Sequence, residues 1–249
     1  MTAASTARWQ CPPAVILAAV DFGEASAAAL RIASAVATAF DARLRAMHAE
    51  RFEPPAYFTL EQVGRLEAEQ RRTQAAGVEH LNRFAVEAAA HPVEGLVLDE
   101  PPVEAILDAA ASADLIVVGT HGRRGPGRWW LGSVAERVVR GAEVPVLVTR
   151  TAPTPARDVF KRIVLVHEGK DAVRMARTCA DRLAMIAGGT VIDGGPIGQC
   201  DAGVVDRASL VVMARGARQS WSLTDQVTRV LGACQKPVLF LPYEKENAP

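Results

Sequence analysis

The sequence carries no excess of charge of either sign, and this absence excludes a class of partner. Its 249 residues contain 28 basic and 28 acidic side chains, so the formal net charge is zero. Proteins that bind nucleic acid or an anionic membrane surface usually present a basic patch, and an even balance gives no sign of one. We therefore expect neither nucleic acid nor a membrane among its partners.

Long apolar segments are also missing. No apolar run approaches the roughly 20 residues that a helix needs to cross a bilayer. Residues 1–13 lack the basic stretch followed by an apolar stretch that is typical of a secretory signal. These features favour a cytoplasmic location.

Cysteines are few and scattered, and no two of them stand in a C-x-x-C pair. Disulfide frameworks and zinc sites normally show paired or regular cysteine spacing, which this sequence lacks. We expect reduced and mostly buried thiols, with neither a redox function nor a bound metal. The four cysteines are Cys11, Cys179, Cys200 and Cys234.

Two groups of glycines frame the segment that says most about function. Gly119-Thr-His-Gly122 follows the apolar run 114–118, which is typical of a strand buried on both faces. Gly132-Ser133 stands directly before residues 134–141, whose apolar side chains recur at helical spacing. Glycine lets a backbone approach a ligand closely, and a helix N-terminus presents unpaired N–H groups to negative charge. We interpret the segment as a phosphate-binding loop, whose basic side chains are Arg123, Arg124 and Arg128.

Strand-like and helix-like segments alternate along the first part of the chain, which predicts an α/β fold with a parallel sheet and helices on both faces. Strands are expected at residues 14–20, 42–48, 94–98, 114–119 and 144–149. Helices are expected at residues 24–39, 59–90, 102–112 and 133–141. A doubly wound, Rossmann-like order 3-2-1-4-5 would place the first and fourth strands side by side, at the switch point where ligands bind.

The rest of the chain repeats this pattern in shortened form. Residues 162–167 repeat the first strand, residues 209–214 repeat the strand before the glycines, and residues 236–241 repeat the closing strand. Nothing in the second copy is expected to correspond to the second strand or to the long helix. Such an internal duplication predicts two doubly wound domains, at residues 1–150 and 158–249, of which the second is truncated.

The second copy also has different residues where the first is expected to bind phosphate. We align His167 with Asp21, Ala214 with Gly119, Ala217 with Gly122, and Thr224-Asp225 with Gly132-Ser133. A carboxylate in the phosphate position would repel a ligand charge by about 4 kcal/mol at ~4 Å and an effective dielectric near 20. We therefore expect one nucleotide site per chain, in the first copy.

The pattern Gly-x2-Gly-x9-Gly-Ser, together with a first strand that ends in Asp21, resembles the universal stress protein family in its ATP-binding branch. The resemblance is strong over residues 13–150 and continues weakly to about residue 243. It implies ATP, or ADP or AMP, as the cofactor, with or without Mg²⁺. In this family the closing strands commonly meet across a two-fold axis, which here implies an intramolecular pseudo-dimer of the two copies and leaves another surface for a homodimer.

The resemblance also implies roles for particular residues. Asp21 would contact the base or the ribose, and Ala49, where valine is commoner, would lie against the base. The residues of the glycine segment would surround the ribose and the phosphates. The full set of implied binding residues is Ala19, Val20, Asp21, Ala49, Val118, Gly119, His121, Gly122, Gly132, Ser133 and Val134.

Several of these residues also have a purely structural interpretation. Ser133 and Glu136 form the pattern of a capping box, which needs no ligand. Asp21 could cap the helix that begins near residue 24. His121 has no evident partner carboxylate, so we expect it to donate a hydrogen bond to phosphate and not to act as a base. The Trp129-Trp130 pair fits an interface or a lid, or simple core packing.

The leading function is an ATP-binding protein of the stress-response type, in which the nucleotide sets conformation or partner choice and is hydrolysed slowly at most. One alternative is an enzyme that uses ATP for hydrolysis or adenylyl transfer. Against this alternative, the sequence has no Gly-x4-Gly-Lys-Ser/Thr loop. The other alternative is a scaffold that binds no nucleotide and acts through its surfaces.

Overall fold

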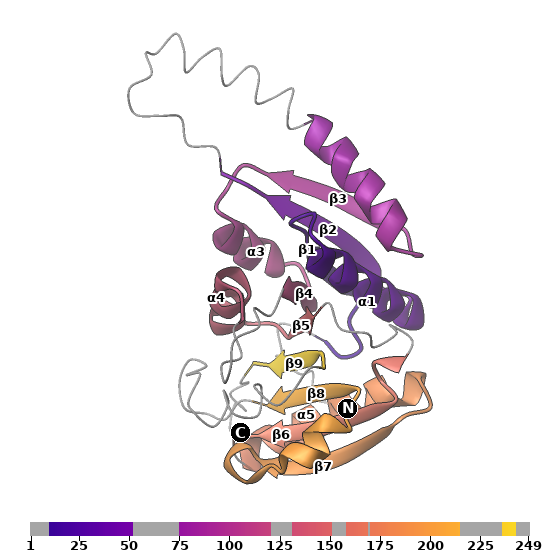
Figure 1. Cartoon of the computed structure of the whole chain (residues 1–249), viewed down its shortest axis with the longest axis vertical. Coiled ribbons are helices and arrows are strands. Elements are labelled where there is room, and N and C mark those ends of the chain that lie inside the picture. The colour runs from indigo at the N-terminus through magenta and orange to yellow at the C-terminus, as the bar shows by residue number, and fades with distance from the viewer. Residues whose placement is uncertain are drawn as a thin grey trace, which may run out of the picture.

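The computed structural model of this protein describes residues 10–51, 75–120, 131–150, 158–168, 170–214 and 236–242 (Figure 1). Residues 75–88 form a helix that lies between β2 and β3 in the chain. The other elements, in chain order, are β1 (Val15–Ala19), α1 (Glu24–Phe40), β2 (Arg43–Ala49), β3 (Val93–Leu98), α3 (Pro102–Ala110), β4 (Leu115–Thr120), α4 (Ser133–Gly141), β5 (Val146–Arg150), β6 (Arg162–His167), α5 (Lys170–Ile186), β7 (Thr190–Pro196), η2 (Ile197–Gln199), α6 (Ala202–Asp206), β8 (Leu210–Ala214) and β9 (Val238–Leu241).

The strands within these residues form one continuous nine-stranded sheet in the order β3-β2-β1-β4-β5-β9-β8-β6-β7. The first five strands are parallel and have the order 3-2-1-4-5 that the sequence predicts. α1 packs on β1, β4 and β5, while α3 and α4 pack together on the opposite face (Figure 1). The fold class expected from the sequence, a doubly wound α/β fold, is therefore confirmed.

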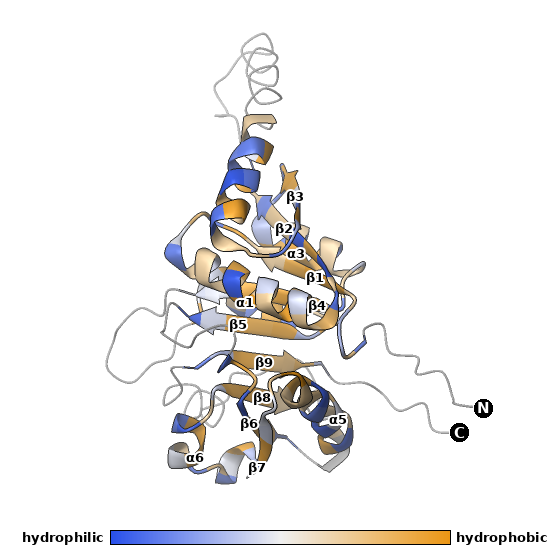
Figure 2. Cartoon of the chain, turned by 90° about the vertical axis from the view of Figure 1, so that its right-hand side faces the viewer, coloured by the Kyte–Doolittle hydropathy of each residue, from blue (hydrophilic) through white to orange (hydrophobic). Residues whose placement is uncertain are grey.

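The central strands are mostly apolar, as is typical of parallel strands that are buried on both faces. Ile116, Val117 and Val118 of β4 are each at most 2% exposed. All four residues of β9, Val-Leu-Phe-Leu, are buried as well. In Figure 2 these strands are coloured as hydrophobic, whereas α5 carries hydrophilic residues along the side that faces away from the sheet.

The ends of the expected elements agree with the structure to within about two residues in the first half, which is the usual uncertainty of such boundaries. The helix expected at residues 59–90 is described only over residues 75–88, where it is continuous through Gly77. Residues 151–157, between the two expected domains, lie outside the described residues, so the division into domains 1–150 and 158–249 stays a prediction. None of the helices in the described ranges is long and apolar enough to span a membrane.

One expectation about the second half was wrong. A counterpart of the second strand is present as β7, which pairs in parallel with β6. Its sequence contains Asp193, Gly194 and Gly195, which have low strand propensity, so the pattern did not predict a strand there. The register of the pair shifts between Leu165 and Val166, and such an irregularity at an edge strand discourages pairing with other chains. Between β7 and β8 the described residues contain neither a third strand nor a long helix, and α6 leads to β8.

The two strands that close the two copies lie side by side. β5 and β9 pair antiparallel, with Val146 opposite Phe240, Leu147 opposite Leu239 and Val148 opposite Val238. Every other strand pair described in the sheet is parallel. This pairing removes two exposed strand edges and joins the two halves into one sheet.

Replacing Phe240 by alanine tests how much this junction stabilises the protein. Phe240 is 1% exposed, and its removal leaves a cavity between the halves. We expect Phe240→Ala to lower the free energy of unfolding by about 3 to 5 kcal/mol in urea denaturation. The control Val86→Ala removes a side chain that is 81% exposed and should change the free energy by less than about 0.5 kcal/mol. Equal effects of the two substitutions would contradict the prediction.

Candidate functional site

Three strand ends meet at the carboxyl edge of the first half-sheet. Ala19 of β1 is in register with Met47 of β2, so Asp21 and Ala49 each lie two residues beyond this pair, at the same edge of the sheet. β1 also pairs with β4, which places Gly119 on the other side of the β1 end. Residues from three segments that are far apart in the sequence are thus brought together at the switch point of the doubly wound sheet.

Asp21 orders the loop between β1 and α1. Its Oδ1 accepts a hydrogen bond from the N–H of Gly23 at 2.9 Å, and its side chain is exposed. α1 begins after Gly23, so this hydrogen bond reaches the residue that directly precedes the helix. The interpretation of Asp21 as a helix cap stays a prediction.

Phe22 fixes the position of this loop. Its backbone has a φ of 60°. Residues other than glycine rarely adopt this left-handed conformation, so the surrounding contacts must enforce it. Its ring centroid lies 4.5 Å from that of His48 and 4.4 Å from that of His80, and Phe84 packs edge-on at 5.5 Å. Nδ1 of His48 hydrogen-bonds the carbonyl oxygen of Val20 at 2.8 Å, which ties the ring cluster to the end of β1.

This ring cluster was not predicted from the sequence. His48 lies near the end of β2, and His80 lies in a helix with many charged residues, so no local pattern connects them. The only sequence signal was an aromatic residue directly after Asp21. The cluster depends on contacts between β2, the β1 loop and the helix at residues 75–88.

Gly119 is required by packing between β4 and α1. A Cβ atom added at Gly119 would lie 2.3 Å from the carbonyl oxygen of Ala25 and 2.8 Å from the backbone nitrogen of Ser26. Neither atom belongs to a flexible side chain, so the helix itself would have to move away. The first glycine of the motif thus lets α1 lie directly on the sheet.

Gly132 has no such packing role among the described residues. Of their atoms, a Cβ atom there would meet only the hydroxyl of Thr120, at an ordinary contact distance of 3.8 Å. Its φ of −53° is open to any residue. Its N–H donates to that hydroxyl at 3.2 Å, which closes the loop between β4 and α4.

The N-terminus of α4 faces outward. Gly132 occupies the cap position, and no side chain of the described residues caps this helix. Ser133 and Val134 are exposed, so their backbone is open to a ligand. The capping-box interpretation of Ser133 and Glu136 is wrong, because Ser133 is the first residue of the helix and the Glu136 carboxylate accepts a hydrogen bond from Arg140 at 2.8 Å.

Contacts with α3 and the sheet hold α4 in place. Ala135, Val138 and Val139 bury one face of the helix. Arg137 donates to Glu104 of α3 at 2.7 Å. The pKa of Glu104 lies below its ordinary value because a backbone hydrogen bond, and after it the Arg137 guanidinium, favour the carboxylate.

The remaining predicted residues divide into core residues and residues that the structure does not describe. Val20 and Val118 are 5% and 2% exposed, so their side chains belong to the core. Ala19 and Ala49 are partly buried at the strand ends. His121, Gly122, the three arginines and Trp129-Trp130 lie outside the described residues, as do Ala217, Thr224 and Asp225.

The structure corrects the alignment of the two copies by one residue. The N–H of Asp114 donates to the carbonyl of Val15, and in the second half the N–H of Ser209 donates in the same way to Arg162. Val15 therefore corresponds to Arg162, which makes Glu168, and not His167, the counterpart of Asp21. His167 and Ala214 are both buried and stand in register with each other.

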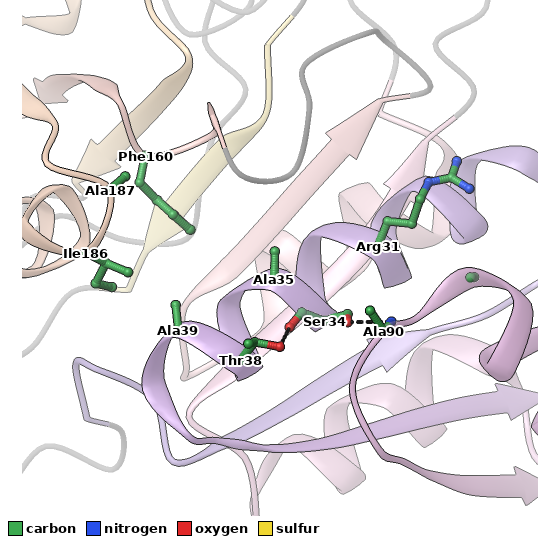
Figure 3. Close-up of a pocket in the computed structure, with 10 residues that line it drawn as sticks. Arg31, Ser34, Ala35, Thr38, Ala39, Ala90, Phe160, Ile186 and Ala187 are labelled. Carbon is green, nitrogen blue, oxygen red and sulfur yellow. Dashed lines mark hydrogen bonds between the residues drawn. The ribbon is translucent and has the colours of Figure 1, made fainter.

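A hollow of about 590 Å³ lies away from these residues, between α1 and the end of α5 (Figure 3). Ser34 and Thr38 line it on α1, and Phe160 and Ile186 line it on the other half. The Ser34 hydroxyl accepts a hydrogen bond from the N–H of Ala90 at 3.0 Å. None of the predicted binding residues that the structure describes lines this hollow, so it is distinct from the part of the candidate site that they form.

Comparison with known proteins identifies the family. The sequence model of the universal stress protein family matches residues 14–150, which include all of the predicted binding residues. The chain belongs to the universal stress protein family. The universal stress protein of the QAH/OAS sulfhydrylase 3′ region of Thermus aquaticus is 39% identical over 138 residues, which are 54% of this chain and 97% of that protein.

Two further relatives place the match in context. A universal stress protein of Mycobacterium tuberculosis is 44% identical over 59 residues, but these are only 24% of this chain and 20% of that protein. The crystal structure of a universal stress protein from Archaeoglobus fulgidus covers 92% of this chain and 98% of its own, with a TM-score of 0.68 and 16% identity. The last similarity shows that the fold of both halves together occurs in another universal stress protein.

The two glycines of the motif offer a matched pair of substitutions. We expect Gly119→Ala to lower the free energy of unfolding by about 1 to 3 kcal/mol, because the added carbon overpacks the contact between β4 and α1. Gly132→Ala should leave it unchanged or raise it by up to about 1 kcal/mol, since the site has room and the unfolded chain loses freedom. Denaturant unfolding of both variants measures the difference. A tolerated Gly119→Ala would show that α1 does not need this close approach.

Proposed function

We propose that this universal stress protein binds one adenine nucleotide, ATP or ADP, at the carboxyl edge of β1 and β4 and acts as a nucleotide-dependent regulatory protein. The observation that carries the proposal is Gly132. The residues that the structure describes around it leave room for a side chain, its φ is unrestricted, and it stands at the exposed N-terminus of a helix. A ligand that approaches the backbone supplies the reason for glycine that the fold itself does not supply.

The N-terminus of α4 suits phosphate groups. Backbone N–H groups of a first helical turn have no partner within the helix, and the helix dipole favours negative charge there. Ser133 adds a hydroxyl at the same exposed position. The resemblance of the motif to the ATP-binding branch of the family supports phosphates at this end of the site.

Asp21 suits the other end of the nucleotide. A carboxylate repels phosphates, but it accepts hydrogen bonds from a ribose hydroxyl or from the amino group of adenine. Ala49 lies at the same edge, at the end of β2, where a small apolar side chain leaves room for a flat base. Phe22 and its ring cluster hold Asp21 in position and would keep the base end of the site rigid.

The second half would act as a structural partner and not as a second site. Ala214 replaces the glycine at the end of β8, although Glu168 keeps an acid at the neighbouring strand end. We interpret the antiparallel pairing of β5 and β9 as an intramolecular pseudo-dimer of the two halves. Any hydrolysis would be slow, since the sequence has no Walker-type loop, and Mg²⁺ would accompany the phosphates without a dedicated cluster of carboxylates.

A change of charge at Gly132 tests the proposed phosphate position. Asn and Asp are both favourable at a helix N-cap and have nearly the same size, so Gly132→Asn and Gly132→Asp should fold equally well. We expect Gly132→Asp to bind ATP at least about ten times more weakly than Gly132→Asn, because its carboxylate repels the phosphates. Isothermal titration calorimetry measures both affinities. Equal affinities would place the phosphates elsewhere.

Stoichiometry tests the proposed loss of the second site. We expect native mass spectrometry and calorimetry to find one adenine nucleotide per chain, with turnover far below the ~10 per second of a typical enzyme. Asp21→Ala should weaken binding, while Glu168→Ala should leave it unchanged. Two equivalent sites, or rapid hydrolysis, would contradict the proposal. Folded protein that binds no adenine nucleotide would favour the scaffold alternative.

A further inference from the structure

Two cysteines that are separated by 168 positions in the sequence meet in the structure. Sγ of Cys11 lies 3.7 Å from the carbonyl oxygen of Cys179 in α5. The Cys11 thiol therefore lies against the backbone of the residue that carries the second thiol. Cys11 is partly exposed, whereas Cys179 is 5% exposed and belongs to the core.

Hydrogen bonds hold the segment that carries Cys11 in place on two sides. The carboxylate of Asp114 accepts hydrogen bonds from the N–H groups of Gln10, Ala14 and Val15, at 3.2, 2.9 and 3.0 Å. On the other side, the guanidinium of Arg182 donates to the carbonyl of Cys11. These hydrogen bonds keep the Cys11 thiol next to α5.

We propose that Cys11 is an oxidation site for hydroperoxides and that Cys179 is its resolving partner, so that oxidation links the segment before β1 to α5 by a disulfide. The partly exposed thiol is the one that a small oxidant reaches first. The buried thiol belongs to the residue whose backbone carbonyl the Cys11 thiol already contacts, so the two sulfur atoms need no large movement to react. The link joins a segment of the first half to a helix of the second half.

The chemistry balances with hydrogen peroxide as the oxidant. The Cys11 thiolate attacks one peroxide oxygen, the O–O bond breaks, and Cys11 becomes a sulfenic acid while hydroxide takes up a proton and leaves as water. The Cys179 thiol loses its proton as its sulfur attacks the Cys11 sulfur, and the S–O bond breaks to release a second water. Two thiols have then lost two electrons to one peroxide molecule.

The surroundings of the two thiols give them different reactivity. The Cys179 hydrogen bond, and in addition the charge of Arg182, lower the pKa of Cys11 from its ordinary value. The contact with Cys11 and burial raise the pKa of Cys179 well above that value. Burial and the charge of Asp201 raise the pKa of Cys200, which makes it a suitable internal comparison. Because the thiolate is the nucleophile, Cys11 should react before Cys200.

Peptide mapping of oxidised protein tests the proposal. The reduced full-length protein is treated with a small excess of hydrogen peroxide, blocked with N-ethylmaleimide and digested without reduction. We expect mass spectrometry to detect a peptide pair linked through Cys11 and Cys179 that disappears on treatment with dithiothreitol. Cys200→Ser should form the same link, whereas Cys11→Ser should not.

A second variant separates the two steps. In Cys179→Ala the sulfenic acid of Cys11 has no resolving thiol, so dimedone should trap it at least several times more than in the unsubstituted protein. Unfolding the protein in guanidinium chloride before oxidation should lower the yield of the Cys11–Cys179 disulfide, because its formation depends on the folded contact. A link of Cys11 to Cys200 or Cys234, or a Cys11 that stays reduced while Cys200 is oxidised, would overturn the proposal.

The link should also be visible in stability. A disulfide that closes a loop of this length constrains the unfolded chain strongly. We expect the midpoint of thermal unfolding to rise by about 5 °C or more on oxidation and to return after reduction. Cys11→Ser should show no such reversible shift. A rise of the same size in Cys11→Ser would assign the effect to another thiol and contradict the proposal.

Discussion

The antiparallel pairing of β5 with β9 is the contact on which the rest of the structure depends. Without it, each half would be a parallel sheet with an exposed and largely apolar closing strand, and such an edge pairs readily with other chains. The pairing turns both closing strands into central strands, and Phe240 is buried as a result. It also sets the halves in opposite directions, so that the carboxyl ends of β5 and β9 point away from each other.

The glycine motif serves two purposes that its spacing does not distinguish. Gly119 is a packing residue, because a side chain there would collide with the backbone of α1. Gly132 has room around it among the described residues and lies at an exposed helix N-terminus. A change at Gly119 therefore disturbs the fold first, and its effect on ligand binding says little about contact with the ligand. Gly132 is the better probe of function.

The first half of the fold and the location of the candidate site could be predicted from the sequence, because apolar periodicity and glycine spacing are local properties of the chain. Other features could not be predicted. β7 contains Asp193, Gly194 and Gly195, so it lacks the composition of a strand and exists because β6 offers it a partner. The alignment of His167 with Asp21 was wrong by one position, since periodicity identifies a strand but does not determine its register.

The sequence by itself determined the kinds of elements, their order and the doubly wound class, since each depends on residues that are close together in the chain. Only the tertiary structure decided which distant residues meet. It brought Phe22, His48 and His80 together beside Asp21, laid α1 against Gly119, and placed Cys11 against Cys179. The physical reason is that such contacts follow from the packing of helices on a twisted sheet, where shape and register outweigh the preferences of any single segment.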